Sequence, residues 1–241
     1  MRIGLSLCRV VVGLLAFCVL ASLAVAQDDQ DANRPPCVTP QCRKIEAFVK
    51  RHYCGNSPAG NGPDNGCEMK GPKRPQTGVE VLAAYQCQWN EDTGVRRCDQ
   101  ESQPPQDVRK ILTQEMQRIG LLAKANGQTL YTVWKSGRSG LVIASADYSR
   151  VADSKLDLCE VIVAINEKGN VTLIRKVPFK TTDADVPDVT TWSLVDLADV
   201  EGDGHEEILL EGDAYEDHWF EVVRVQGGAV KTIFSGLGYY L

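Results

Sequence analysis

The segment CEVIVAINEKGNVTLIRKV, residues 159–177, decides how most of this chain folds. Two apolar runs rich in Val and Ile flank the short polar run NEKGN. Apolar β-branched runs separated by a few Gly and Asn residues are typical of a β-hairpin. The segment therefore predicts antiparallel strands near 157–166 and 170–177.

The same pattern continues on both sides of this hairpin, from residue 128 to the C-terminus. QGG, residues 226–228, predicts a second tight turn. Further strands are expected near 129–135, 140–147, 190–198, 206–214, 217–226 and 229–235. Eight strands with short connections predict an antiparallel β-meander over 128–241, arranged as a sandwich or as a partial propeller-like sheet.

Cys159, in the quoted segment, is expected to be a buried and unreactive free thiol. It shares a strand face with Val161, Val163 and Ile165, because alternate residues of a strand point to the same side. A thiol on an apolar face behaves as a small hydrophobic side chain.

Upstream of residue 128 the apolar residues recur at helical spacing. In residues 104–127, Val108, Ile111, Leu112 and Ile119 follow steps of three and four behind a Pro-Pro start. A shorter helix is expected after Cys42, where Ile45, Phe48 and Val49 show the same spacing. These one or two helices make the expected fold class α+β, mainly β.

Six cysteines crowd into residues 37–98 and predict three disulfides. Pairing residues 79–100 as a hairpin around EDTG places Cys87 directly opposite Cys98, which is suitable for a cross-strand disulfide. Cys54–Cys67 would close a loop rich in Gly, Pro and Asn, and Cys37–Cys42 is what remains, although Cys42 could bridge elsewhere. Zinc ligation is the alternative, but the chain has no CxxC pair and only three His.

The first 26 residues have the pattern of a secretory signal peptide. Arg2 and Arg9 precede an apolar run, and Ala24-Val25-Ala26 resembles a cleavage site. A retained membrane anchor is the alternative, although the run is short for a bilayer span. The sequence therefore predicts a signal peptide (1–26), a disordered arm (27–36), a Cys-rich head (37–127) and an antiparallel β-domain (128–241), in a secreted or periplasmic protein without a membrane span after cleavage.

Charge is distributed unevenly along the chain. Residues 181–241 contain 14 acidic residues against Arg224 and Lys231, a net charge of −12, whereas residues 27–180 have a net charge of +4. An acidic chain of this kind is not expected to bind nucleic acid, because phosphate neutralisation needs Lys and Arg. The asymmetry favours a local site for cations.

The segment DVEGDGHEE, residues 199–207, is the candidate for that cation site. Calcium takes roughly six to eight oxygen ligands, which a tightly turned loop can supply. Gly204 permits the turn, and the expected ligands are the side chains of Asp199, Glu201, Asp203 and Glu207 with the carbonyl of His205. A solvated acidic turn between two strands is the alternative.

Residues 192–214 resemble the calcium loop of FG-GAP and VCBS-type β-propeller repeats, whose usual form is DxDGDGxxD/E between two strands. The resemblance covers about 20 residues, occurs once, and differs at Glu201, where Asp or Asn is usual. It implies the ion and the loop geometry, but not a complete propeller.

These patterns favour a secreted, calcium-stabilised binding or structural protein without catalytic activity, acting on a protein or glycan partner. A metal-assisted hydrolase using the carboxylates near 199–217 is the first alternative, since His218 lies beside Asp213 and Asp217. No GxSxG or HExxH motif is present. A secreted inhibitor that presents the disulfide-closed 54–67 loop is the second alternative.

Overall fold

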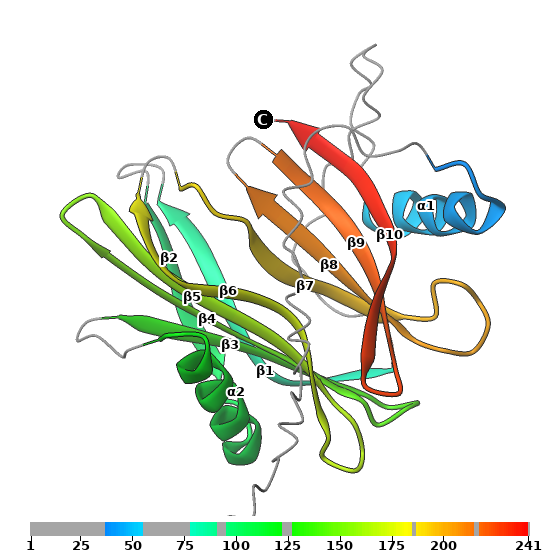
Figure 1. Ribbon diagram of the computed structural model, residues 1–241, viewed down its shortest axis with the longest axis horizontal. Coiled ribbons are helices and arrows are strands. Elements are labelled where there is room, and N and C mark those ends of the chain that lie inside the picture. Colours follow the sequence, from blue (N-terminus) through cyan, green and yellow to red (C-terminus); the bar gives the residue numbers. More distant parts are fainter. Residues whose placement is uncertain are drawn as a thin grey trace, which may run out of the picture. The chain divides into compact units, whose positions relative to one another are not determined.

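The computed structural model describes residues 37–54, 78–90, 95–121, 127–184, 187–214 and 217–240. These residues form two helices and two antiparallel sheets, so the expected α+β, mainly β class is confirmed (Figure 1). The elements are α1 (Pro40–Tyr53), β1 (Val79–Asn90), β2 (Val95–Ser102), α2 (Gln106–Arg118), β3 (Gln128–Ser136), β4 (Val142–Ala152), β5 (Lys155–Ile165), β6 (Val171–Asp183), β7 (Thr191–Ala198), β8 (Glu207–Ala214), β9 (Asp217–Gln226) and β10 (Ala229–Tyr240). The predicted signal peptide and arm, 1–36, lie outside the described residues, as does Cys67.

The hairpin predicted from residues 159–177 is formed by β5 and β6. Its register brings Ile165 opposite Val171, and Asn166 closes the turn by accepting the backbone N–H groups of Lys168 and Asn170, both at 3.0 Å. Gly169 adopts φ +78°, a conformation that other residues rarely take. The NEKGN run therefore forms the turn because Asn166 accepts nearby backbone N–H groups and Gly169 adopts the positive φ.

β5 and β6 belong to a six-stranded sheet with the order β2-β1-β3-β4-β5-β6. Cys87 pairs with Cys98 in the β1–β2 hairpin, as the register predicts, and their disulfide joins Cα atoms 4.0 Å apart. β1 also pairs with β3. The sheet thus continues across residue 127, where the sequence predicted the Cys-rich head to end.

Helix α2 covers one face of this sheet. Its buried residues, Val108, Leu112 and Met116, pack in one cluster with Val161 and Val163 of β5. Cys159 lies in the same cluster and is only 1% exposed, since it shares their strand face. The helix begins after Pro104-Pro105 and ends before Gly120, which adopts φ +101°.

The second sheet has four strands in the order β10-β9-β8-β7, and α1 packs on its outer face. Ile45 and Val49 of α1 are fully buried against residues such as Leu209 and Val222. Thr39 caps the helix by accepting the backbone N–H of Cys42, and the Cys37–Cys42 disulfide brackets this cap with Cα atoms 5.4 Å apart.

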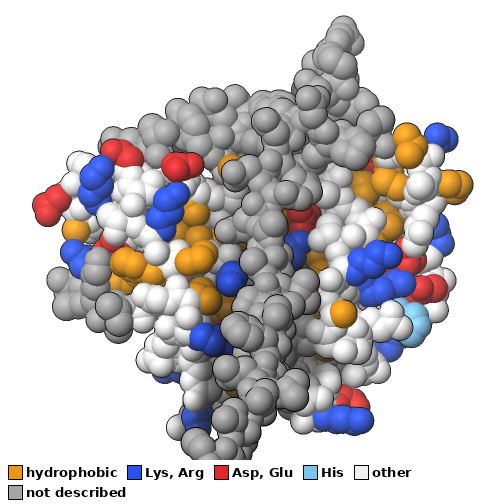
Figure 2. Space-filling view, in the orientation of Figure 1, with side chains coloured by type: hydrophobic (Ala, Val, Ile, Leu, Met, Phe, Trp, Pro, Cys, Tyr) orange, Lys and Arg blue, Asp and Glu red, His pale blue; other side chains and the backbone are white. Residues whose placement is uncertain are grey.

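A third apolar cluster joins the two sheets face to face. Ile143 and Ile162 of the first sheet meet Leu194, Ile208 and Leu210 of the second. The strands therefore form a sandwich, one of the two predicted arrangements, with a helix on each outer face. Neither described helix is long and apolar enough to cross a membrane. On the face in Figure 2, side chains of both charges are interspersed.

Candidate functional site

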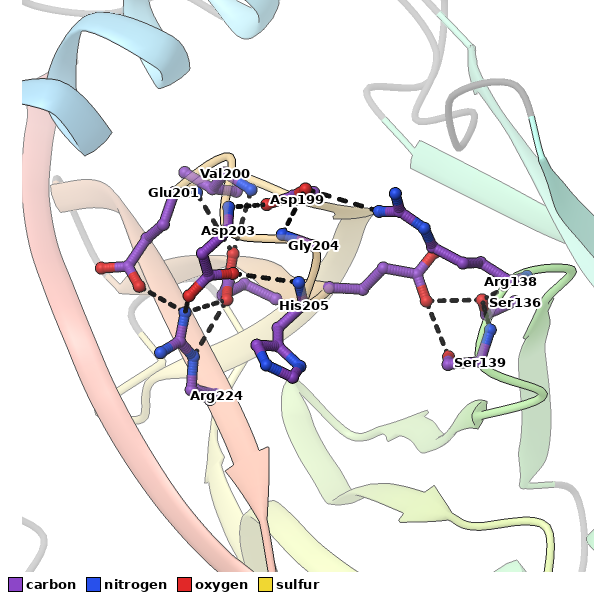
Figure 3. Close-up of polar contacts among 12 residues, drawn as sticks. Ser136, Arg138, Ser139, Asp199, Val200, Glu201, Asp203, Gly204, His205 and Arg224 are labelled. Carbon is purple, nitrogen blue, oxygen red and sulfur yellow. Dashed lines mark hydrogen bonds and ion pairs between the residues drawn. The ribbon is translucent and has the colours of Figure 1, made fainter.

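The acidic loop, residues 199–207, connects β7 to β8 at the point where Ala198 pairs with Glu207 (Figure 3). Gly202 and Gly204 adopt φ +67° and +90°. Side chains with a Cβ rarely take these conformations, so glycine at both positions lets the loop reverse within a few residues. The remaining loop positions are free to carry carboxylates.

Asp199 and Asp203 hold the loop backbone. Asp199 accepts the backbone N–H of Asp203 at 3.0 Å and that of Gly204 at 2.9 Å, one with each carboxylate oxygen. Asp203 accepts the N–H of His205 at 2.9 Å. That hydrogen bond, with the charge of Arg224, holds the pKa of Asp203 below its usual value.

Glu207 is the buried anchor of the loop. Its side chain is fully buried, and one oxygen accepts the N–H groups of Val200 at 2.9 Å and Glu201 at 3.4 Å. Burial raises the pKa of Glu207, and hydrogen bonding and charge from Arg224 oppose that shift. A carboxylate in this position needs a cation close by, because a buried unpaired charge is very costly.

Arg224 of β9 supplies that cation. Pairing of Ile208 with Val223 brings Arg224 beside Glu207, and its Nε donates to Glu207 at 3.0 Å. Its Nη2 contacts Asp203 at 3.1 Å and also pairs with Glu201. The hydrogen bond with Glu207 is the main reason that the pKa of Arg224 is raised.

The acidic loop also contacts the rest of the fold. Glu206 accepts hydrogen bonds from the hydroxyls of Ser136, at 2.5 Å, and Ser139, at 2.7 Å. Nη1 of Arg138 lies 3.4 Å from Oδ2 of Asp199. From α1, Lys44 donates to the carbonyl of Glu201, whose carboxylate accepts from Gln41. The loop therefore links the six-stranded sheet, the four-stranded sheet and α1.

Four of the five predicted calcium ligands are carboxylates, and these divide into two groups. Glu201, Asp203 and Glu207 each place one oxygen within 4.8 Å of the others. Asp199 instead directs its carboxylate at the loop backbone and Arg138. Sequence reasoning missed Arg224, although it is one of only two basic residues after residue 181 and follows the acidic loop on a strand two elements away.

The loop borders a cavity of about 990 Å³ at one end of the sandwich. Its lining includes Asp203, His205, Glu206 and Arg224. The β5–β6 and β9–β10 turns also line it. The acidic loop thus faces a concave surface.

The histidine considered for the hydrolase alternative lies elsewhere on the sheet. Nδ1 of His218 is 3.5 Å from Asp213 at the far end of β8. Asp213 lies six positions beyond Glu207 along β8, a distance of about 20 Å in an extended strand. The acidic loop and His218 therefore do not converge on one site.

Comparison with known proteins identified no relative of this chain. The chain has no significant match among protein-family models, curated proteins or solved structures. The resemblance of residues 192–214 to a calcium loop therefore rests on the residues of the loop itself.

Proposed function

We propose that this protein is an exported binding or structural protein without catalytic activity, working in a secreted or periplasmic compartment. The disulfides Cys37–Cys42 and Cys87–Cys98 support export, because such bonds persist in oxidising compartments. The N-terminal sequence, with its positive start, apolar run and Ala-x-Ala ending, supports the same conclusion.

A binding role is favoured by how the polar residues of the loop are used. Asp199, Glu206 and Glu207 accept hydrogen bonds that hold the fold, and none of them is needed as a reacting group to explain its position. The neighbouring cavity offers a concave surface where a protein or glycan partner would bind.

We also propose that the acidic loop binds calcium and thereby stabilises the sandwich. The observation that carries this proposal is the convergence of Glu201, Asp203 and Glu207 within 4.8 Å. The longer side chain of Glu201 and the presence of Arg224 both favour a modest affinity, with Kd on the order of 10⁻⁴ to 10⁻³ M as in extracellular calcium modules.

Thermal unfolding in calcium and in chelator tests the calcium proposal. A ligand of the folded state raises stability by RT ln(1 + [L]/Kd), so roughly 10 mM calcium should raise Tm by a few degrees. Asp203→Ala should abolish the difference by removing a ligand. Asp188→Ala, which removes an exposed acid outside the loop, should keep it. Identical melting of the wild type in calcium and in chelator would show that the loop is a polar turn.

A metal-assisted hydrolase remains the second candidate because of the His218–Asp213 contact. We rank it lower since that pair lies about 20 Å along the sheet from the acidic loop. The inhibitor alternative depends on residues 54–67, most of which lie outside the described residues.

A further inference from the structure

Helix α1 carries positive charge on a chain that is acidic as a whole. The helix contains four cations, Arg43, Lys44, Lys50 and Arg51, against one acid, Glu46, which gives a net charge of +3. The whole chain has a net charge of −6. Arg43 and Arg51 are both exposed, and Arg43 donates to the carbonyl of Cys37. These two charges are therefore available to an anionic partner.

The cations lie on the face of α1 that points away from the sheet. Ile45 and Val49 are fully buried against the four-stranded sheet. Two residues of a helix span about 200°, so Arg43 lies almost opposite Ile45. Lys50 and Arg51 follow Arg43 by roughly two helical turns and share its face. The outer face of α1 is therefore a row of cations over a helix that is fixed by its buried face.

Phe48 connects this row of cations to a cavity. Its ring packs against the exposed ring of His52, with ring centroids 4.4 Å apart. Phe48 also lines a cavity of about 570 Å³ together with Arg138. Lys44 and Arg51 are four and three positions from Phe48, the spacing at which helix side chains are neighbours. The cations and the cavity therefore form one continuous surface.

The chemistry of this surface discriminates between kinds of polyanion. Arg and Lys pair with carboxylate and sulfate groups through charge-assisted hydrogen bonds. Asp199 and Glu206 also line the cavity, and their negative charges would repel the phosphates of a nucleic acid. Carboxylates accept hydrogen bonds, so the same two residues can bind sugar hydroxyls. A lipid bilayer is too broad to enter the cavity. An anionic sugar chain fits both parts of the surface.

We propose that the outer face of α1 and the cavity beside Phe48 bind an acidic polysaccharide, a glycan that carries carboxylate or sulfate groups. The helix cations pair with its acidic groups, and the cavity holds its sugar hydroxyls. This inference rests on the proposed binding function and names the chemical class of the glycan partner.

Binding of the full chain without its predicted signal peptide to immobilised polysaccharides tests the proposal. Biolayer interferometry in calcium-free buffer compares polygalacturonate, which carries carboxylates, heparin, which carries sulfates, and neutral dextran. We expect binding to at least one acidic polymer and none to dextran. Raising the salt concentration should weaken binding, because salt screens exposed charges.

The double variant Arg43→Gln with Arg51→Gln locates the site. It should raise the Kd about tenfold, since two exposed ion pairs with the polymer are lost. Lys110→Gln with Arg118→Gln is the matched control, because it removes the same charge from the exposed surface of α2, and it should leave the Kd unchanged. Equal loss of affinity in both double variants would show a response to net charge alone and would overturn the site.

The nature of the partner is tested with other polyanions. Tighter binding to single-stranded DNA or to phosphatidylglycerol vesicles than to either acidic polysaccharide would overturn the proposal. Absence of binding to both acidic polymers would overturn it too, and would leave the proposed binding function to another partner. Shortening of a bound polymer, detected by size-exclusion chromatography, would instead contradict the proposed function without catalytic activity.

Discussion

At the scale of single residues, the pKa of Cys159 reflects its buried environment. Its thiol is 1% exposed and packs with Val161 and Val163 beneath α2. Burial, with a smaller effect from Glu160, raises its pKa from 9.0 to about 11. Because the thiolate is the reactive form, the folded protein protects this cysteine from both oxidation and alkylation.

The raised pKa of Cys159 predicts a loss of stability at alkaline pH. Between pH 9 and 11 the folded thiol keeps its proton while the unfolded thiol loses it, so the free energy of unfolding falls as pH rises. The fall should approach about 2 to 3 kcal/mol by pH 11. Urea unfolding of the wild type and Cys159→Ala at several pH values measures it. A constant stability difference between the two proteins across this range would contradict the prediction.

At the scale of elements, an ion pair joins the facing strands β6 and β9. Arg175 pairs with Glu221, donates to Thr232 at 3.0 Å, and lies 5.0 Å from the ring centre of Trp192. Glu160 of β5 accepts the backbone N–H of Trp192 at 2.9 Å. These polar contacts add to the apolar cluster between the two sheets, as do the hydrogen bonds of Glu206 with Ser136 and Ser139. They join specific positions on the facing strands.

Arg175→Met should destabilise the protein by about 3 kcal/mol, since Glu221 would remain buried without its cation. Combining it with Glu221→Gln should recover part of this loss, because the unpaired charge is then removed. Urea unfolding of the two single variants and the double variant measures the coupling between the residues. Strictly additive effects would mean that the ion pair contributes no energy of its own.

At the scale of the whole molecule, the acidic C-terminal part of the chain forms ion pairs with the more basic part that precedes it. Residues 181–241 carry a net charge of −12. The structure pairs several of their acids with cations from earlier in the chain: Asp199 with Arg138, Glu221 with Arg175, Asp183 with Lys155, and Asp188 with Lys180. The acidic C-terminal part is therefore partly neutralised by folding against the basic N-terminal part.

Export of the whole molecule should include removal of residues 1–26. N-terminal sequencing of exported protein should begin at Gln27, because the A-x-A ending of the apolar run favours cleavage after Ala26. Mass spectrometry under non-reducing conditions should detect the Cys87–Cys98 bridge in the same material. Retention of residues 1–26, or a lipid-modified start at Cys18, would contradict this processing.

The sequence by itself determined the local structure of this protein. The strands of residues 128–240 begin and end within a few residues of their predicted bounds, except that β4, β6 and β10 run five or six residues further. The hairpin register predicted the partner of Cys87, and strand alternation placed Cys159 on a buried face. These features depend on side-chain periodicity and turn residues, which act over a few positions of the chain.

Only the tertiary structure decided which strands share a sheet, which face each helix covers and what compensates the acidic loop. Arg224 reaches Glu207 because β8 and β9 pair in one register, and a shift of one residue would turn it to the other face. Arg175 meets Glu221 only because the two sheets stack. Such contacts join residues far apart in the chain, so no local pattern encodes them. The sequence therefore indicated that the acidic segment needs a compensating cation, but not that Arg224 of the same chain supplies one.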